Sequence, residues 1–294
     1  MAVFKKTRED ILIDVLSMAI ALIVIVTTLY PVYYCFIYSF NEGTDAAMGS
    51  FYLFPRKFTF SNYATVLSQK SLFLSFAMTV ARTLAGTLTS VLFTAVFSYG
   101  LSKKHLMFRK TYIIIGIVTL YFSGGLVPNY LLLKQLHLLN SFFVYIVPSL
   151  LSFFNALLFI AFFNELPEAL EESARIDGAR NMTLFLKIVL PLSAPIIATI
   201  SLFNGVSHWN DWFTPAYYVT NEKLITLPAV LMRIMSLASA QQEMQRHVHN
   251  FVPTTTPESI RYATLVVAIA PITLVYPFIQ KYFVKGMMVG SIKA

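Results

Sequence analysis

Long stretches without charge alternate with short polar links along most of this chain. Asp, Glu, Lys and Arg are all absent from residues 15–40, 111–133, 135–164, 188–210 and 262–280. A sixth apolar stretch, residues 71–102, is interrupted only by Arg82. About 20 apolar residues allow an α-helix to cross the hydrocarbon core of a bilayer. The pattern therefore predicts an all-α membrane protein whose six transmembrane helices occupy about residues 12–38, 72–102, 111–133, 141–164, 188–212 and 262–284.

The composition agrees with this pattern. Apolar residues make up 57% of the 294-residue chain and charged residues 12%, and the mean hydropathy is +0.67. These values lie outside the range of soluble globular domains. We expect one membrane domain over residues 1–294, with a retained first helix because the N-terminal apolar run is too long for a signal peptide. Cys35, the single cysteine, leaves no partner for an internal disulfide.

Lysine and arginine are concentrated at those helix ends that would share one side of the membrane. The basic residues in question are Lys5, Lys6, Arg8, Lys103, Lys104, Arg109, Lys110, Arg175, Arg180, Lys187, Lys281, Lys285 and Lys293. Because cytoplasmic loops carry an excess of such residues, both termini are predicted to be cytoplasmic. The net charge of +8 then reflects membrane topology and not nucleic-acid binding.

Two features interrupt the predicted spans. Arg82 either faces a partner, a water-filled cavity or, by snorkelling, the interface, or the second span begins later and leaves Arg82 near the outer headgroups. Residues 123–125 (Ser-Gly-Gly), followed by Pro128, either break the third span beside a cavity or mark its outer end. Both pairs of alternatives are open from the sequence. The loop over residues 41–70 is expected to be ordered and external, and a second external loop covers residues 213–261.

A charge-dense insert separates the fourth and fifth spans. Residues 162–191 read FFNELPEALEESARIDGARNMTLFLKIVLP. Pro167 suits the first position of a helix, and the glutamates that follow complement the positive end of its dipole. Gly178 is well placed to end this helix in a left-handed conformation. A second short amphipathic piece over residues 182–187 then leads to Pro191 at the start of the fifth span. The insert, residues 165–187, is expected to lie across the cytoplasmic face.

The insert resembles the EAA loop in the membrane-spanning subunits of ATP-binding-cassette (ABC) importers. ELPEALEESARIDGA followed by IVLPLSAPIIATI is similar to the MalG-like permeases of carbohydrate importers. FSGGLVPNYLLLKQLHLLNS, HWNDWF and the tail KYFVKGMMVGSIK resemble the LplC-type branch, which is associated with oligosaccharide, polysaccharide and alginate uptake. The similarity extends from Tyr63 to the C-terminus. Ser173 stands at the second position of the EAA core, where small residues are common.

The resemblance implies a type I ABC importer permease fold with a cytoplasmic coupling helix, in a bacterial cell membrane. Its partners would be a second homologous permease, a dimer of ABC ATPase subunits that use ATP and Mg, and an extracytoplasmic sugar-binding lipoprotein. This chain would bind no cofactor of its own. The implied ATPase-coupling residues are Glu168, Glu171, Glu172, Ser173, Ala174, Asp177, Gly178 and Pro191. Glu172 would contact a basic residue of the ATPase, and the tail beyond Phe283 would also meet the ATPase.

No catalytic or metal-binding pattern occurs in the sequence. The phosphate-binding motif GxxxxGK[ST] is absent, so we expect a transport subunit and not an enzyme. His247 and His249 form the only close histidine pair, and solvation explains them better than a metal does. Polar and aromatic residues suited to a sugar path are Tyr121, Asn129, Tyr130, Asn155, Asn204, His208, Trp209, Asn210 and Asp211. The alternative function is an ion-gradient-driven secondary transporter without an ATPase, and a passive channel is weaker still because rings of charged pore residues are lacking.

Overall fold

The computed structural model describes residues 7–47, 53–68, 70–236, 259–271, 273–274 and 277. In these ranges the chain is helical, and its only extended pairing is an isolated antiparallel bridge between Asn41 and Phe58. The described residues form two compact units. The first, here called the N-terminal unit, contains the residues before Lys70 together with those from Arg233 to Ile269. The second, the central unit, contains Lys70–Met232 and the described residues after Ile269.

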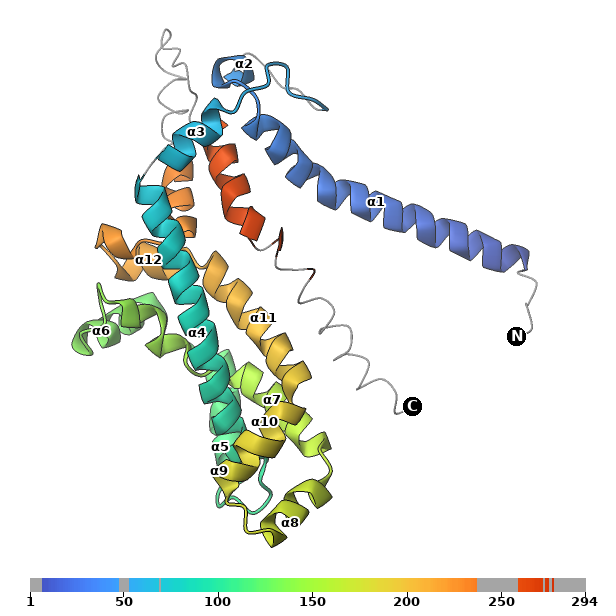
Figure 1. Ribbon diagram of the computed structural model, residues 1–294, viewed down its shortest axis with the longest axis vertical. Helices are drawn as coiled ribbons and strands as arrows, with labels where there is room; N and C mark the ends of the chain where they lie inside the picture. The colour runs from blue at the N-terminus through green and yellow to red at the C-terminus, as the bar shows by residue number, and fades with distance from the viewer. Residues whose placement is uncertain are drawn as a thin grey trace. The chain divides into compact units, whose positions relative to one another are not determined.

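The N-terminal unit begins with the long helix α1, Arg8–Ser39 (Figure 1). Its start is closed by a capping box, in which the Asp10 carboxylate accepts from the Thr7 backbone N–H at 2.8 Å and the Thr7 hydroxyl accepts from the Asp10 N–H at 3.3 Å. Apolar side chains are exposed along most of the helix, from Ile11 to Phe36. At 1.5 Å per residue, its 32 residues are long enough to cross a bilayer, so this helix matches the first predicted span.

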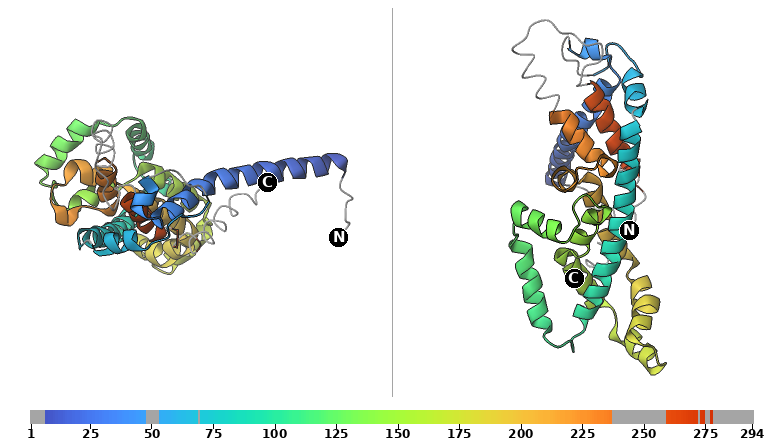
Figure 2. Two further views of the ribbon diagram at one scale, coloured as in Figure 1. Left: turned by 90° about the horizontal axis from the view of Figure 1, so that it is seen from above. Right: turned by 90° about the vertical axis from the view of Figure 1, so that its left-hand side faces the viewer.

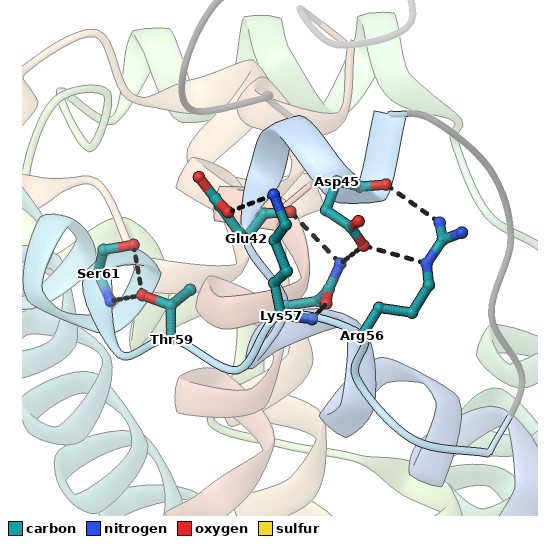
Figure 3. A network of polar contacts seen from close by, with 7 residues as sticks. Glu42, Asp45, Arg56, Lys57, Thr59 and Ser61 are labelled. Carbon is teal, nitrogen blue, oxygen red and sulfur yellow. Dashed lines mark hydrogen bonds and ion pairs between the residues drawn. The ribbon is translucent and has the colours of Figure 1, made fainter.

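The described parts of the loop after α1 are ordered by polar contacts, as the sequence predicts. Helix α2, Gly43–Ala47, and helix α3, Ser61–Ser68, flank the bridge between Asn41 and Phe58. Two ion pairs close the loop, Arg56 with Asp45 at 3.1 Å and Lys57 with Glu42 at 3.6 Å (Figure 3). In the same unit, the apolar helix Ser259–Pro271 brings Tyr262 against Tyr38, with ring centroids 5.0 Å apart.

The core of the central unit lies where three helices meet. These are α4, Lys70–Ser102, α7, Phe153–Glu165, and α11, Ala194–Asn210, and α4 contacts both of the others (Figure 1). Buried members of this core are Val91, Ala95, Tyr99, Phe159, Phe163, Phe185, Val189 and Ile200. In water, burial of this apolar surface would be the main contribution that holds the three helices together. In a bilayer, close packing of the side chains holds them together instead.

The third predicted span is broken. Helix α5, Arg109–Tyr121, and helix α6, Leu126–Gln135, meet at an angle of 117°. The turn is visible between the two green helices in the right-hand view of Figure 2. Gly125 has φ +81 and ψ −178, a conformation that only glycine adopts readily. The chain therefore turns sharply at residues 123–125, which agrees with both alternatives left open by the sequence, and α5 alone is too short to cross a bilayer.

Two further predicted spans are bent. The 3₁₀ turns η1, Phe142–Tyr145, and η2, Val147–Ser149, precede α7 with a bend of 48°. The segment Asn181–Leu192 meets α11 at 80°. Within the described residues, two helices are long and apolar enough to cross a membrane, or up to five if each bent pair counts as one span. The sixth predicted span, 262–284, is described only over residues 262–271, 273–274 and 277. The unit also contains α12, Phe213–Tyr218, the 3₁₀ turn η4, Glu222–Leu224, and part of an apolar helix, Leu227–Ser236.

Candidate functional site

The charge-dense insert forms helix α8, Glu168–Ile176, at the end of the central unit where α4 gives way to α5 (Figure 1). The chain leaves α7 in an extended conformation at Leu166. Pro167 has an extended ψ of 123° and is the N-cap residue of α8. The sequence predicts Pro167 at the first helical position, and this prediction is wrong by one residue. The proline ring still fixes φ at −60°, which sets the direction in which α8 begins.

Gly178 ends α8 in the left-handed conformation that the sequence predicts. Its φ is +84, and two backbone hydrogen bonds close the helix. The Ala179 N–H donates to the Ala174 carbonyl at 2.9 Å, and the Gly178 N–H donates to the Arg175 carbonyl at 3.0 Å. This pair of bonds is a Schellman motif, which satisfies carbonyls that the helix itself leaves unpaired. The end of α8 is therefore fixed by local structure.

Two of the glutamates on α8 are held by lysines that follow α4. Glu168 accepts from the Lys104 ammonium at 2.6 Å, and both of these side chains are largely exposed. The hydrogen bond and the charge of Lys104 lower the pKa of Glu168 below its ordinary value. Glu171 accepts from the Lys103 ammonium at 2.5 Å through both carboxylate oxygens. This second pair is much less exposed, at 19% for Lys103 and 23% for Glu171.

Glu172 differs from both neighbours. Its side chain is exposed and makes no hydrogen bond or ion pair with any residue that the structure describes. It lines a cleft of about 430 Å³ between α8 and the residues that follow α4. Charged groups of both signs line this cleft, contributed by Lys103, Lys104, Glu168, Glu171, Glu172 and Arg175. Among the three glutamates of α8, Glu172 is therefore the one available to an incoming cation.

The surface around Glu172 is partly apolar. No residue of α8 is buried, and Ile176 is 87% exposed although it is a large aliphatic residue. Leu170 and Met182 are also exposed. Ser173 and Asp177 are exposed and Ala174 is half-buried, so the helix presents small, acidic and aliphatic side chains together. Ile176, one helical turn from Glu172, places an exposed aliphatic group beside this carboxylate.

The segment after α8 is anchored in the core of the central unit. Helix α9, Asn181–Leu184, continues through a π-helical turn, Phe185–Val189, into α10, Leu190–Leu192. Leu184 and Phe185 are buried, so the predicted short piece over residues 182–187 is one part of a longer helical segment. Pro191 is exposed within α10, and the sharp change of direction falls just after it, before α11.

The residues proposed for a sugar path fall into several groups. The Asn155 amide donates to the Asn204 side-chain oxygen at 3.3 Å, between α7 and α11. Trp209 is buried against Phe76, and Tyr130 lies beside Tyr218 with ring centroids 6.3 Å apart. The remaining members of the set that are exposed are Tyr121, Asn129 and Asn210.

Arg82 is enclosed by protein and does not lie at the start of a helix. It sits twelve residues inside α4, which begins at Lys70, and it is 2% exposed. Its guanidinium donates to the Asp211 carboxylate at 2.8 Å and lies 3.4 Å from Nδ1 of His208. The same group lies 4.3 Å from the centre of the Tyr145 ring. Helix α4 therefore begins well before Arg82, and the carboxylate of Asp211, just after the end of α11, neutralises the buried charge.

The sequence does not reveal that Lys103 and Lys104 belong to this site. It relates them only to membrane orientation, because no local pattern pairs them with glutamates 68 and 64 positions away. No group of three or more His, Cys, Asp or Glu side chains that could hold a metal occurs in the described part of the chain. His247, His249 and the tail beyond Phe283 lie outside the described residues.

Comparison with known proteins gives consistent matches over most of the chain. Residues 72–289 match the family described as "Binding-protein-dependent transport system inner membrane component". Protein LplC of Bacillus subtilis (strain 168) is 36% identical over 90% of each chain. The polygalacturonan/rhamnogalacturonan transport system permease protein YtcP of the same organism is 35% identical over 96% of this chain and 98% of its own. One chain in the crystal structure of a bacterial ABC transporter involved in the import of the acidic polysaccharide alginate superposes with a TM-score of 0.85. The two are 29% identical over 95% of this chain and 99% of that chain.

Proposed function

Because the chain belongs to the family of inner-membrane components of binding-protein-dependent transport systems, we propose that it is a permease subunit of an ATP-driven importer of oligosaccharides or polysaccharides. It would form half of the translocation path and couple to separate ATPase subunits through α8. The relatives support this cargo class, since one is named for polygalacturonan and rhamnogalacturonan transport and another belongs to an alginate importer.

The observation that carries the coupling role is the contrast among the three glutamates of α8. Lys104 and Lys103 already neutralise Glu168 and Glu171, whereas Glu172 is exposed beside a cleft and has no cation within the described residues. Ile176, one helical turn after Glu172, adds an exposed aliphatic side chain next to it. An ATPase groove that supplies a basic residue to Glu172 and apolar contacts to Ile176 would cover this face.

The remaining partners follow from the family. A second homologous permease would complete the path, a dimer of ABC ATPase subunits would bind ATP and Mg, and a sugar-binding lipoprotein would deliver cargo from outside. This arrangement requires both termini and α8 on the cytoplasmic side of the bacterial cell membrane, with the loop over 213–261 outside. Polar residues such as Asn155, Asn204 and Trp209 would contribute to the path.

Reversing the charge of Glu172 tests the coupling role. In the purified complex, Glu172→Lys should lower sugar uptake and sugar-stimulated ATPase activity by about tenfold or more, a typical size for coupling between sites. Glu9→Lys is the matched control, because Glu9 is also exposed but lies at the start of α1. Amounts of assembled complex are compared by size-exclusion chromatography. Full stimulation in the assembled Glu172→Lys complex would contradict the docking of α8.

The alternative of an ion-gradient-driven transporter makes a different prediction. Such a transporter needs ionisable groups that titrate near the middle of the membrane, whereas Arg82 and Asp211 are committed to each other. Liposomes that contain this chain alone should show no proton- or sodium-driven sugar uptake. Uptake under those conditions, without ATP, would favour the alternative.

A further inference from the structure

The contact between Lys103 and Glu171 lies at the junction between α4 and the insert. Lys103 is the first residue after α4, and its ammonium lies 2.5 Å from each carboxylate oxygen of Glu171. The same ammonium lies 4.0 Å from the centre of the Tyr99 ring, one turn earlier in α4. A cation between a carboxylate and an aromatic face is held from two sides.

Tyr99 connects this contact to the core of the central unit. Its side chain is 8% exposed. Its ring lies 6.1 Å from that of Phe163 in α7 and 5.1 Å from that of Phe185 in the segment after α8. Helix α7 before α8 and the segment after α8 therefore both pack on Tyr99, whose ring also contacts Lys103. Lys103 links the body of α4 to the middle of α8.

Helix α8 itself has few other attachments to the unit. No residue of α8 is buried, so apolar packing does not hold the helix along its length. The second ion pair, Lys104 with Glu168, has side chains 81% and 74% exposed, and exposed pairs of this kind contribute little because water and salt screen them. The Lys103–Glu171 pair is about one-fifth exposed and doubly hydrogen-bonded. Of the two ion pairs described between α8 and the end of α4, Lys103–Glu171 is therefore the stronger one.

We infer that Lys103 and Glu171 are positioning residues that transmit movement of α8 to α4. This inference rests on the proposed coupling function. When the ATPase displaces α8, the force on Glu171 passes through Lys103 to the end of α4, the longest helix of the central unit. Helix α4 in turn contacts α7 and α11. Without the pair, α8 would still be joined to the unit at both ends but could move without α4.

A charge-swap series in the intact importer complex tests this link. Lys103→Glu and Glu171→Lys should each lower uptake per ATP hydrolysed by about tenfold, since each variant places two like charges together. The double variant Lys103→Glu/Glu171→Lys should recover most of that loss, because the pair is restored with opposite polarity. Recovery should be incomplete, since a carboxylate over the Tyr99 ring has no cation–π attraction. Lys103→Arg should retain coupling.

The exposed pair between Lys57 and Glu42, with side chains 63% and 44% exposed, supplies the matched control. Lys57→Glu, Glu42→Lys and their double variant make the same charge changes away from α8, and they should leave uptake per ATP within about twofold of the parent. A role in folding alone would lower the amount of complex without changing this ratio. The inference is overturned if the swapped Lys103/Glu171 double variant is no better than either single variant, or if the exposed pair gives equal losses. Loss of coupling in Glu172→Lys with no effect in the Lys103 series would remove this link only. Full coupling in Glu172→Lys would instead remove the docking of α8.

Discussion

Neighbouring residues of α8 can serve opposite purposes because a helix turns by about 100° per residue. Glu171 is paired with Lys103 and is half-buried, whereas Glu172, which lines the same cleft, stays exposed and forms no ion pair within the described residues. One carboxylate is thus committed inside the chain and the next is available outside it. The sequence shows both glutamates but cannot distinguish them, since the distinction depends on a lysine 68 positions away.

Arg82 shows the same dependence on distant residues. Its carboxylate partner is 129 positions away, so the sequence alone leaves the side chain either in a cavity or near the headgroups. A guanidinium that is 2% exposed needs a counter-charge, because an unpaired buried charge is costly. The pair therefore accounts for Arg82 structurally, as a link between α4 and the end of α11.

Removing one partner of this pair should destabilise the protein. Asp211→Ala leaves the buried guanidinium without its carboxylate and should lower the free energy of unfolding by about 3 kcal/mol. Lys104→Ala removes a partner of an exposed pair and should cost less than about 1 kcal/mol. The midpoint of thermal unfolding of the purified complex compares the two. A midpoint for Asp211→Ala equal to that of Lys104→Ala would contradict a stabilising role for the buried pair.

Elements were predictable where local chemistry decides them. The end of α8 follows from Gly178 and the break after α5 follows from Gly125, and both are visible in the sequence because few other residues adopt those backbone conformations. The 80° bend before α11 is not predictable from the sequence. Pro191 lies inside the helical segment before the bend, and the chain turns only at Ser193. Similarly, hydrophobic runs locate apolar helices but do not tell whether a run is straight or bent.

The left-handed end of α8 gives a prediction at the scale of the element. Gly178→Ala forces a Cβ into φ +84 and should cost about 1 kcal/mol, whereas Gly178→Asn should cost less because asparagine tolerates this region. Gly100→Ala is the control, since an added Cβ within α4 meets no atom within 4 Å and alanine favours helix. Thermal unfolding midpoints should rank Gly100→Ala above Gly178→Asn and Gly178→Asn above Gly178→Ala. Equal midpoints for all three would show that the helix end is not held in this conformation.

At the scale of the whole molecule, the proposed function depends on which side of the membrane each segment faces. The distribution of Lys and Arg predicts that α8 is cytoplasmic and that the loop after α1 is external. Cysteine labelling can decide this, because Cys35 is the only natural cysteine and can be replaced by alanine. Ser173 and Phe54 are both exposed, so either position can carry a single introduced cysteine.

A membrane-impermeant maleimide should label Phe54→Cys in intact spheroplasts and Ser173→Cys only after the membrane is opened, both in the Cys35→Ala background. Co-expression of the ATPase should then slow labelling at Ser173→Cys and leave labelling at Phe54→Cys unchanged, because only α8 would be covered. Labelling of Ser173→Cys from outside would place α8 on the wrong side for an ATPase. Equal labelling rates with and without the ATPase would leave α8 uncovered in the assembly, so the exposed Glu172 and Ile176 would need another explanation.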